Sequence, residues 1–200
     1  MTFDREISGI YRLKVPFMSV YTSVFLVQFE GKNLLIDCAT DASDVDNYII
    51  PALKELRLTL DDINYLIVTH NHEDHAGGKG RILECNQKIQ VVGDNNIEFS
   101  REIKIYPLIG HTQDFLGVLD LRSGTLISGD GLQGAGIGKF RCSLENKEEY
   151  IKSIEKIQAD ERIQNILFSH AYEPWYKNGA FGRNEVEQIL LDCKKYAKGR

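Results

Sequence analysis

A dense group of histidine and carboxylate side chains follows a short apolar run before the middle of the chain. The segment reads Tyr65-Leu-Ile-Val-Thr-His70-Asn-His72-Glu-Asp74-His75-Ala-Gly-Gly78. In an extended backbone, side chains two positions apart point to the same side, so His70 and His72 can bind the same metal ion. The chain must then turn to bring Asp74 and His75 round, and the glycines permit a close turn. Four ligands at this spacing could serve two adjacent metal ions, which a polar loop carrying histidines by chance would not explain.

Three further candidate ligands, His111, Asp130 and His170, each follow an apolar strand. Because α/β folds place reactive groups at strand ends, the whole set is more informative than any one loop histidine. All five histidines of the chain belong to it. Imidazole and carboxylate ligands suit zinc, and they also suit iron or manganese. Seven ligands shared by two ions leave room for solvent, which is typical of a catalytic site.

The order of apolar segments predicts one mixed α/β domain over residues 1–200. Strands are expected from β-branched and aromatic enrichment at 7–15, 20–29, 33–36, 63–68, 89–92, 102–109, 115–121, 125–128 and 163–168. Helical spacing predicts helices after Ser43, over 79–85, after Asn146 and after Asn184. The segment Ser43 to Asp46 resembles a capping box. Pro51 lies inside the pattern that follows, so this helix is expected to be kinked or to start later.

Composition narrows the class of protein. The formal net charge of −5 does not favour binding to nucleic acid. We see no signal peptide and no apolar stretch long enough to span a bilayer, so no membrane contact is expected. The four cysteines, which are Cys38, Cys85, Cys142 and Cys193, are far apart and are expected to be free buried thiols. A cytoplasmic location follows as an expectation.

The combined pattern resembles the metallo-β-lactamase-fold hydrolase superfamily. It is carried by the motif from His70 to His75, by Gly110-His111-Thr112, by Ser128-Gly129-Asp130 and by Ser169-His170. The resemblance implies a four-layer αβ/βα sandwich of the α/β (α+β) class, with metals at the edge between two sheets. It assigns one ion to His70, His72 and His111, and a second ion to Asp74, His75 and His170, with Asp130 bridging them. Asp37 matches a common family acid that supports the ligands from outside the coordination sphere.

The implied activity is that of a metal-dependent hydrolase with two divalent ions, zinc being the first choice. Two ions about 3.5–4 Å apart would share a bridging hydroxide at neutral pH. This hydroxide would attack a thioester, ester or lactone carbonyl, and the metals would hold the developing oxyanion. Asp74 would be the catalytic residue that orients the bridging water and carries a proton to the leaving group.

Within the superfamily, the pattern is most similar to small hydrolases of the glyoxalase II (hydroxyacylglutathione hydrolase) type, through Gly129-Asp-Gly-Leu132. Two features depart from that type: Thr112-Gln113-Asp114 replaces the frequent Thr-Pro-Gly, and a glutathione-binding helical domain does not follow His170. A general thioester or ester hydrolase is therefore the safer reading. Asp130 argues against a typical β-lactamase. The absence of a tyrosine shortly after Asp130 weakens a lactonase reading, and the short acidic chain argues against a nuclease.

Two other readings stay open at this point. A mononuclear iron sulfur dioxygenase, similar to the persulfide dioxygenases, would use the first-site ligands, and a phosphodiesterase or lactonase of the same fold would use both sites. A third reading, in which Gly129 to Gly134 spells G-x-G-x-x-G, lacks the helix that a dinucleotide site requires. Metal content would separate hydrolase from dioxygenase.

The substrate is expected to be a small molecule bound near two segments that follow the ligands. The candidate lining residues are Phe140, Arg141, Tyr172 and Trp175. Aromatic side chains could pack an acyl group, and the arginine could meet an anionic substrate. The sequence predicts neither the substrate itself nor the oligomeric state.

Overall fold

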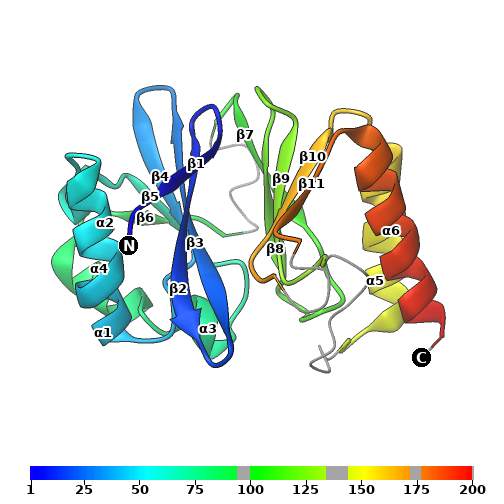
Figure 1. Cartoon of the computed structure of the whole chain (residues 1–200), viewed down its shortest axis with the longest axis horizontal. Helices are drawn as coiled ribbons and strands as arrows, with labels where there is room; N and C mark the ends of the chain where they lie inside the picture. Colours follow the sequence, from blue (N-terminus) through cyan, green and yellow to red (C-terminus); the bar gives the residue numbers. More distant parts are fainter. Residues whose placement is uncertain (94–99, 134–143, 172–176, 200) are drawn as a thin grey trace. The chain divides into compact units, whose positions relative to one another are not determined.

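The computed structural model divides the chain into two units, Met1–Asn95 and Asn96–Arg200. It describes residues 1–93, 100–133, 144–171 and 177–199. Each unit consists of a β-sheet with helices packed on one face (Figure 1).

The sheet of unit 1 has the order β1-β2-β3-β4-β5-β6 among the described residues. Its strands are β1 (Asp4–Ile7), β2 (Ile10–Phe17), β3 (Val20–Phe29), β4 (Lys32–Ile36), β5 (Tyr65–Ile67) and β6 (Gln90–Val91). The first four strands pair antiparallel in sequence order, whereas β4, β5 and β6 are parallel. The strands predicted over 20–29, 33–36, 63–68 and 89–92 are confirmed, with ends shifted by up to two residues. The strand predicted over 7–15 begins only at Ile10, because the chain turns at Ser8 and Gly9, and β1 before this turn was not predicted.

The connection between β3 and β4 is a two-residue hairpin turn. Phe29 pairs with Lys32, and the two residues between them, Glu30 and Gly31, have φ angles of 46° and 70°. Two successive positive φ values match the twist of the flanking strands. The glycine supplies one of these without strain.

The helices of unit 1 lie between β4 and β6 in the sequence. They are α1 (Ala42–Asp44), the π-helical turn η1 (Val45–Ile49), α2 (Ile50–Glu55), the 3₁₀ turn η2 (Leu60–Asp62), α3 (Glu73–Ala76) and α4 (Lys79–Cys85). The predicted start at Ser43 is wrong, because Asp41 is the N-cap and its side chain accepts from the Asp44 N–H. The expectation that this helix is kinked or starts later at Pro51 agrees with the structure. The π-helical turn η1 precedes α2, and α2 begins at Ile50, so Pro51 lies in its first turn, where the missing N–H costs no helical hydrogen bond.

Alternate residues of the central strands point toward these helices and form the core of unit 1. Leu26, Leu35 and Leu66 come from neighbouring strands, and Val45 and Leu53 come from the helices opposite. All of these side chains are buried. Burial of a leucine is worth about 1.5–3 kcal/mol, so this layer stabilises the crossover from β4 to β5 that positions the histidine segment.

The sheet of unit 2 has the order β11-β10-β9-β8-β7 in the described part of the chain. Its strands are β7 (Ile103–Pro107), β8 (Leu116–Asp120), β9 (Thr125–Gly129), β10 (Asn165–Phe168) and β11 (Gly179–Phe181). The strands predicted over 115–121 and 125–128 are confirmed as β8 and β9, which form an antiparallel hairpin with Gly124 at a φ of 62° in its turn. Strand β11 was not predicted, because it is only three residues long and pairs with β10 as the edge strand.

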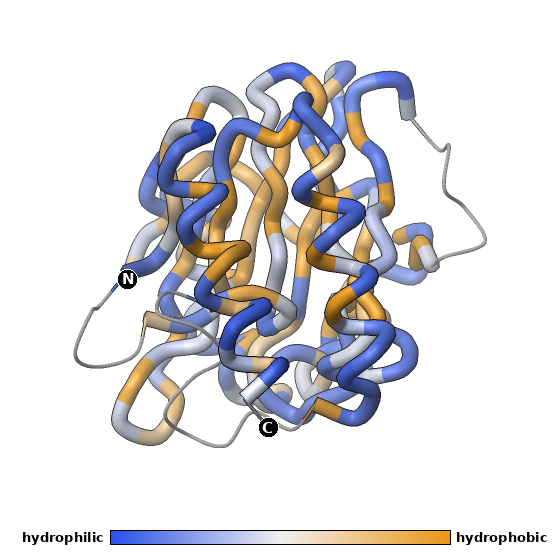
Figure 2. Tube along the Cα trace, turned by 90° about the vertical axis from the view of Figure 1, so that its right-hand side faces the viewer, coloured by the Kyte–Doolittle hydropathy of each residue, from blue (hydrophilic) through white to orange (hydrophobic). Residues whose placement is uncertain are grey.

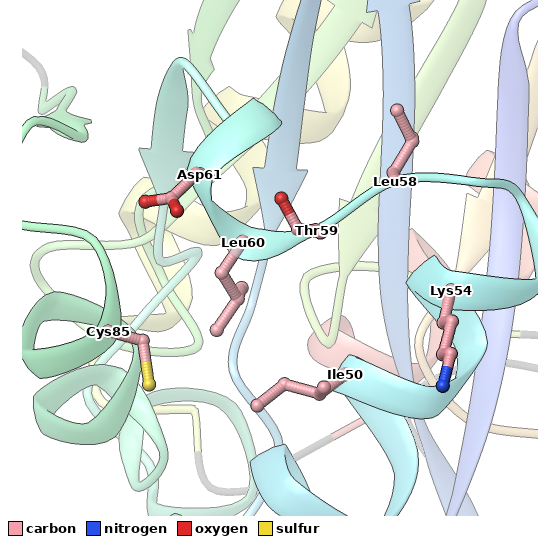
Figure 3. Close-up of a pocket in the computed structure, with 7 residues that line it drawn as sticks. All are labelled: Ile50, Lys54, Leu58, Thr59, Leu60, Asp61 and Cys85. Atoms are coloured by element: carbon pink, nitrogen blue, oxygen red, sulfur yellow. The ribbon is translucent and has the colours of Figure 1, made fainter.

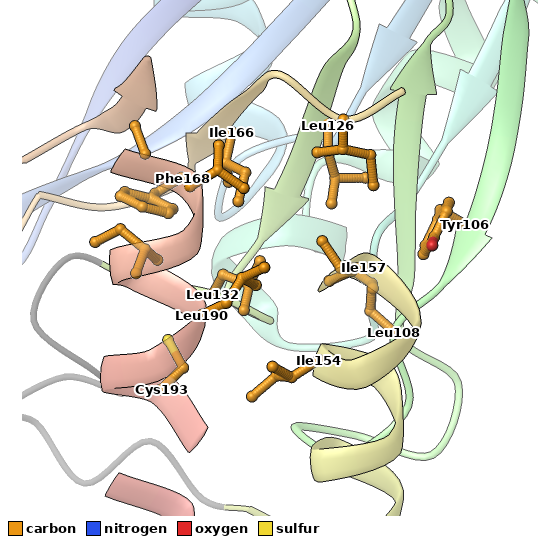
Figure 4. Packing of buried hydrophobic residues seen from close by; sticks show 14 of the residues in the cluster. Tyr106, Leu108, Leu126, Leu132, Ile154, Ile157, Ile166, Phe168, Leu190 and Cys193 are labelled. Atoms are coloured by element: carbon orange, nitrogen blue, oxygen red, sulfur yellow. The ribbon is translucent and has the colours of Figure 1, made fainter. Parts of the chain in front are cut away.

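Two amphipathic helices, α5 (Lys147–Ala159) and α6 (Arg183–Lys198), cover one face of this sheet. Hydrophobic residues recur between hydrophilic ones along both helices (Figure 2). The predicted cap of α5 is confirmed, since the Asn146 side chain accepts from the Glu149 N–H at 3.1 Å. Figure 4 shows the core beneath, in which Ile154 and Ile157 of α5 and Leu190 of α6 belong to one buried cluster with residues of the sheet such as Phe168.

The thiol of Cys193 is expected to resist alkylation in the folded protein. It lies fully buried in this core, and burial raises its pKa to about 11. Because the thiolate is the nucleophile, iodoacetamide at pH 8 should label the partly exposed Cys85 much faster than Cys193. Peptide mass spectrometry measures both rates, and unfolding in guanidinium should equalise them. Equal labelling in the native state would contradict the burial.

Cys38, Cys85 and Cys193 are free thiols, as predicted, and Cys38 and Cys193 are also buried. The prediction of burial is wrong for Cys85, which is partly exposed, and Cys142 lies outside the described residues. In the part of the chain that the structure describes, no helix is both long and apolar enough to cross a membrane.

Candidate metal centre

The parallel pairing of β4 with β5 brings Asp37 next to the histidine segment. Ile36 is paired with Ile67, so both strands end at the same edge of the sheet. The Asp37 N–H donates to the Ile67 carbonyl at 2.8 Å, which continues the ladder by one residue. At that point the backbone of Asp37 turns to a φ of 64°, a left-handed conformation that aspartate adopts more readily than most residues. Its carboxylate therefore lies beside the residues that follow β5.

The Asp37 carboxylate is fully buried and accepts three hydrogen bonds. Its Oδ1 accepts from the Thr69 N–H at 2.7 Å, and its Oδ2 accepts from the Thr69 hydroxyl at 3.0 Å. The same Oδ2 lies 2.8 Å from Nδ1 of His75. A buried carboxylate needs such donors to offset its desolvation. Asp37 thus ties the first and last parts of the histidine segment together.

The four candidate ligands of unit 1 form two close pairs. Nε2 of His70 lies 2.8 Å from Nδ1 of His72. Nε2 of His75 lies 3.3 Å from Oδ2 of Asp74. His70, Asp74 and His75 are buried, and His72 is half-buried. The rings of His70 and His75 are also close, with centroids 4.3 Å apart, so the four side chains form one cluster.

The turn that brings Asp74 and His75 round is helical. Both residues lie in α3, which is a single helical turn. Two hydrogen bonds from other segments hold its backbone. Thr22 Oγ1 donates to the Asp74 carbonyl at 3.0 Å, and the Cys38 N–H donates to the His75 carbonyl at 2.7 Å. Gly77 and Gly78, which follow, have helical φ angles of −63° and −80°. The predicted turn therefore does not need the conformational freedom of glycine. A Cβ on Gly77 would lie 1.7 Å from the Thr40 carbonyl oxygen. The glycines therefore allow two backbone segments to approach closely.

Gly77→Ala is accordingly expected to lower the free energy of unfolding by about 3 kcal/mol, because backbone atoms must move to admit the methyl group. Gly80→Ala is the matched control, since a Cβ there would meet no atom within 4 Å. Gly80 lies in α4, where alanine should stabilise by about 0.5–1 kcal/mol. Guanidinium unfolding of both variants measures the difference. Equal effects at the two positions would contradict the close approach at Gly77.

In unit 2 the candidate ligands also follow strand ends at one edge of the sheet. Strands β9 and β10 are parallel, with Gly129 paired to Phe168, so Asp130 and His170 emerge side by side. Nε2 of His170 lies 3.1 Å from Oδ1 of Asp130, and both side chains are buried. Because β7 and β9 are both antiparallel to β8, β7 ends at this same edge, ahead of His111.

The His111 ring is positioned by the residues around it. Gly110 precedes it at a φ of 142°, and a Cβ there would lie 2.4 Å from the Cβ of Tyr150 on α5. The His111 ring meets the edge of Phe115, with centroids 5.7 Å apart and planes at 77°. His111 is buried, so its orientation is fixed by packing.

The donor atoms of the seven side chains fit a metal of the kind predicted. The groups that could hold a metal ion consist of His70, His72, Asp74, His75, His111, Asp130 and His170. All are imidazole nitrogens or carboxylate oxygens, which suit zinc, iron or manganese. Asp74 and Asp130 are 8% and 6% exposed, and a buried carboxylate is stabilised by a cation. Within each unit, the chemistry and burial of these side chains therefore suit the ligands of a divalent metal ion.

The candidate substrate residues Phe140, Arg141, Tyr172 and Trp175 lie outside the described residues. The glycine-rich segment from Gly134 does as well. Thr69 was not singled out from the sequence, although its side chain contacts both Asp37 and His70. Its position directly before His70 was the feature of the sequence that could have indicated a contact with the ligands.

A shallow hollow of about 300 Å³ lies on the helical side of unit 1. Figure 3 shows Ile50, Leu60 and Cys85 lining it, with Asp61 and Lys54 at its margins. Leu60 and Asp61 precede β5, whereas the histidines follow it, so the hollow lies toward the opposite end of that strand. It is not part of the candidate centre.

Comparison with known proteins places these features in a family. The family model of the metallo-β-lactamase superfamily matches residues 19–84. A beta-lactamase-like protein 2 homolog from Drosophila melanogaster is 31% identical, covering 85% of this chain and 67% of its own length. A hydroxyacylglutathione hydrolase from Vibrio campbellii is 27% identical, covering 83% of this chain and 72% of its own length. The chain belongs to the metallo-β-lactamase superfamily, whose members are generally hydrolases.

Solved structures agree on the fold. The metallo-β-lactamase FIM-1 from Pseudomonas aeruginosa, in its mono-zinc form, aligns with a TM-score of 0.72 over 98% of this chain and 96% of that one, at 19% identity. A metallo-β-lactamase from Erythrobacter litoralis aligns with a TM-score of 0.73 over 97% of this chain. The predicted fold class and the predicted superfamily are confirmed.

Proposed function

We propose that the chain is a dinuclear metal-dependent hydrolase that acts on a thioester, ester or lactone. The two units act as one domain in this proposal. His70, His72 and His111 hold one ion, Asp74, His75 and His170 hold the other, and Asp130 serves both. Two divalent ions held in this way supply hydroxide near neutral pH and polarise a carbonyl group.

The observation that carries the proposal is the pairing of buried donors at strand ends in each unit. In unit 1 the donors fall into the pairs His70–His72 and Asp74–His75, and in unit 2 Asp130 meets His170. A structural metal site needs only four protein ligands, usually including cysteine. Seven ligands without cysteine favour open coordination and therefore catalysis.

Asp74 is the proposed catalytic residue. Its carboxylate is buried beside His75 and is held by α3, whose carbonyl at Asp74 is anchored by Thr22. A carboxylate at this point can orient the attacking water and pass a proton to the leaving group. Asp37 supports the arrangement by holding His75 through Nδ1, which leaves Nε2 to act as the ligand.

Zinc is the proposed metal, and an acylated thiol is the favoured substrate. Zinc suits the donor set, and FIM-1 is a zinc protein of the same fold. The Vibrio campbellii relative is named as a hydroxyacylglutathione hydrolase, which supports thioesters as the first substrate class to test. Phe140, Arg141, Tyr172 and Trp175 remain the proposed lining residues. We further propose that the substrate is a small molecule and that neither nucleic acid nor a membrane is a partner. A cytoplasmic location belongs to the same proposal, and the free thiols are consistent with it.

The test is elemental analysis of protein purified without added metal, followed by a panel of thioester, ester, lactone and phosphodiester substrates. Two zinc ions per chain and turnover of a thioester are expected. If none of the substrates is hydrolysed with two ions bound, the proposal fails. One iron per chain with oxygen uptake on a persulfide would instead identify the dioxygenase alternative.

A further inference from the structure

We propose that Thr69 is a positioning residue that fixes the tautomer of His70 before any metal binds. The inference rests on the proposed metal-binding role of His70, but its central claim concerns hydrogen bonds within unit 1. Thr69 is fully buried between the Asp37 carboxylate and the His70 ring. Its hydroxyl therefore connects a fixed negative charge to one nitrogen of a candidate ligand.

The hydrogen bonds determine which nitrogen of His70 carries the proton. The Thr69 hydroxyl has a single hydrogen, and it donates this hydrogen to Asp37 Oδ2 at 3.0 Å. Nδ1 of His70 lies 3.1 Å from the same hydroxyl oxygen, which is left to accept. Nδ1 must then donate, so the neutral ring carries its proton on Nδ1. Nε2 then carries the lone pair, which is the form of the ring that a metal requires.

His75 is fixed by the same carboxylate without a relay. Its Nδ1 lies 2.8 Å from Asp37 Oδ2, which accepts only. Its proton is therefore on Nδ1, and Nε2 is the donor atom for a metal. One buried aspartate thus sets the tautomers of two ligands, one directly and one through Thr69.

The third imidazole of unit 1 behaves differently. Nδ1 of His72 lies 2.8 Å from Nε2 of His70, which carries a lone pair, so without metal His72 donates from Nδ1. When His70 gives its lone pair to a metal, this hydrogen bond is lost. For His72 to coordinate through Nδ1, its proton must move to Nε2. Because His72 is half-buried, solvent can carry this exchange. If His72 holds a metal through Nδ1, the nitrogen that faces His70, loading should change the tautomer of His72 and leave those of His70 and His75 unchanged.

Long-range ¹H–¹⁵N correlation spectra of the histidine rings test the inference in metal-free protein. Wild type should show Nδ1–H on His70 and His75. Thr69→Ser keeps the hydroxyl and should give the same spectrum. Thr69→Val keeps the shape and the backbone bond to Asp37 Oδ1 but removes the relay, so His70 should lose its Nδ1–H preference. Zinc affinity, measured by competition with a chelator, should fall about 10- to 100-fold in Thr69→Val and stay unchanged in Thr69→Ser.

The possible results separate the inference about the tautomers from the proposed function. An Nε2–H tautomer on His70 in the wild type overturns the inference, whether or not the valine variant folds. An unchanged His70 tautomer and unchanged zinc affinity in a folded Thr69→Val also overturn it. If the tautomers are as stated but wild type binds no divalent metal, the hydrogen-bond relay stands and the proposed function fails.

Discussion

Asp74→Asn is expected to lower kcat about 100- to 10,000-fold for any substrate that the protein hydrolyses, because it removes the carboxylate proposed to move the proton. The substitution keeps the size of the side chain and its position in α3, where the backbone is held by Thr22 and Cys38. It also weakens one proposed metal ligand, so turnover must be measured at saturating zinc with the metal content of the same sample determined.

The neighbouring residue provides the control. Glu73 lies in the same helical turn but is exposed, so Glu73→Gln makes the same chemical change away from the candidate ligands. Its kcat should stay within about twofold of wild type, since an exposed carboxylate contributes little here. Full turnover by Asp74→Asn with both ions bound would remove Asp74 from the catalytic role.

Asp37→Asn is expected to destabilise the metal-free protein by about 2–4 kcal/mol and to weaken zinc binding about 10- to 100-fold. Three donors converge on the Asp37 carboxylate: the Thr69 N–H, the Thr69 hydroxyl and His75 Nδ1. Asparagine offers one acceptor oxygen, and its NH₂ group would face a donor in a fully buried place. Asparagine tolerates the left-handed backbone at this position, so the effect reports on the hydrogen bonds.

Guanidinium unfolding of metal-free protein measures the first effect, and chelator competition measures the second. Asp41→Asn is the matched control, because Asp41 is an exposed N-cap where asparagine serves as well as aspartate. A change below about 0.5 kcal/mol for Asp37→Asn, comparable to an ordinary surface substitution, would show that the three bonds do not stabilise the fold.

Local patterns in the sequence were sufficient for some of the elements. Strand β3 and helix α4 have the predicted bounds, because alternating or helically spaced apolar residues continue to clear turn signals at their ends. The candidate ligands at strand ends were predicted for the same reason, since each follows an apolar run. These inferences required only neighbouring residues.

Features that depend on contacts across the sequence were not predictable in this way. Strand β11 forms because β10 offers an edge, and its three residues carry no pattern of their own. The cap at Asp41 was missed because Ser43 offers an equally good cap sequence. The role of Thr69 depends on a hydroxyl meeting a carboxylate 32 positions earlier, which follows from the register of β4 and β5.

The wide turn at Val45–Ile49 has a consequence for the order in which unit 1 folds. The segment from Ala42 to Glu55 consists of two α-helical pieces of three and six residues around this turn, with Pro51 in the second. Helices of fewer than about 12–15 residues are marginal alone, so this crossover should form only on a sheet that already exists. The hairpins of β2, β3 and β4 join neighbouring residues and close within about 1–10 μs. We therefore expect β5 to pair with β4 only after the crossover has formed, and Thr69 and His75 to meet Asp37 among the last events in the folding of unit 1.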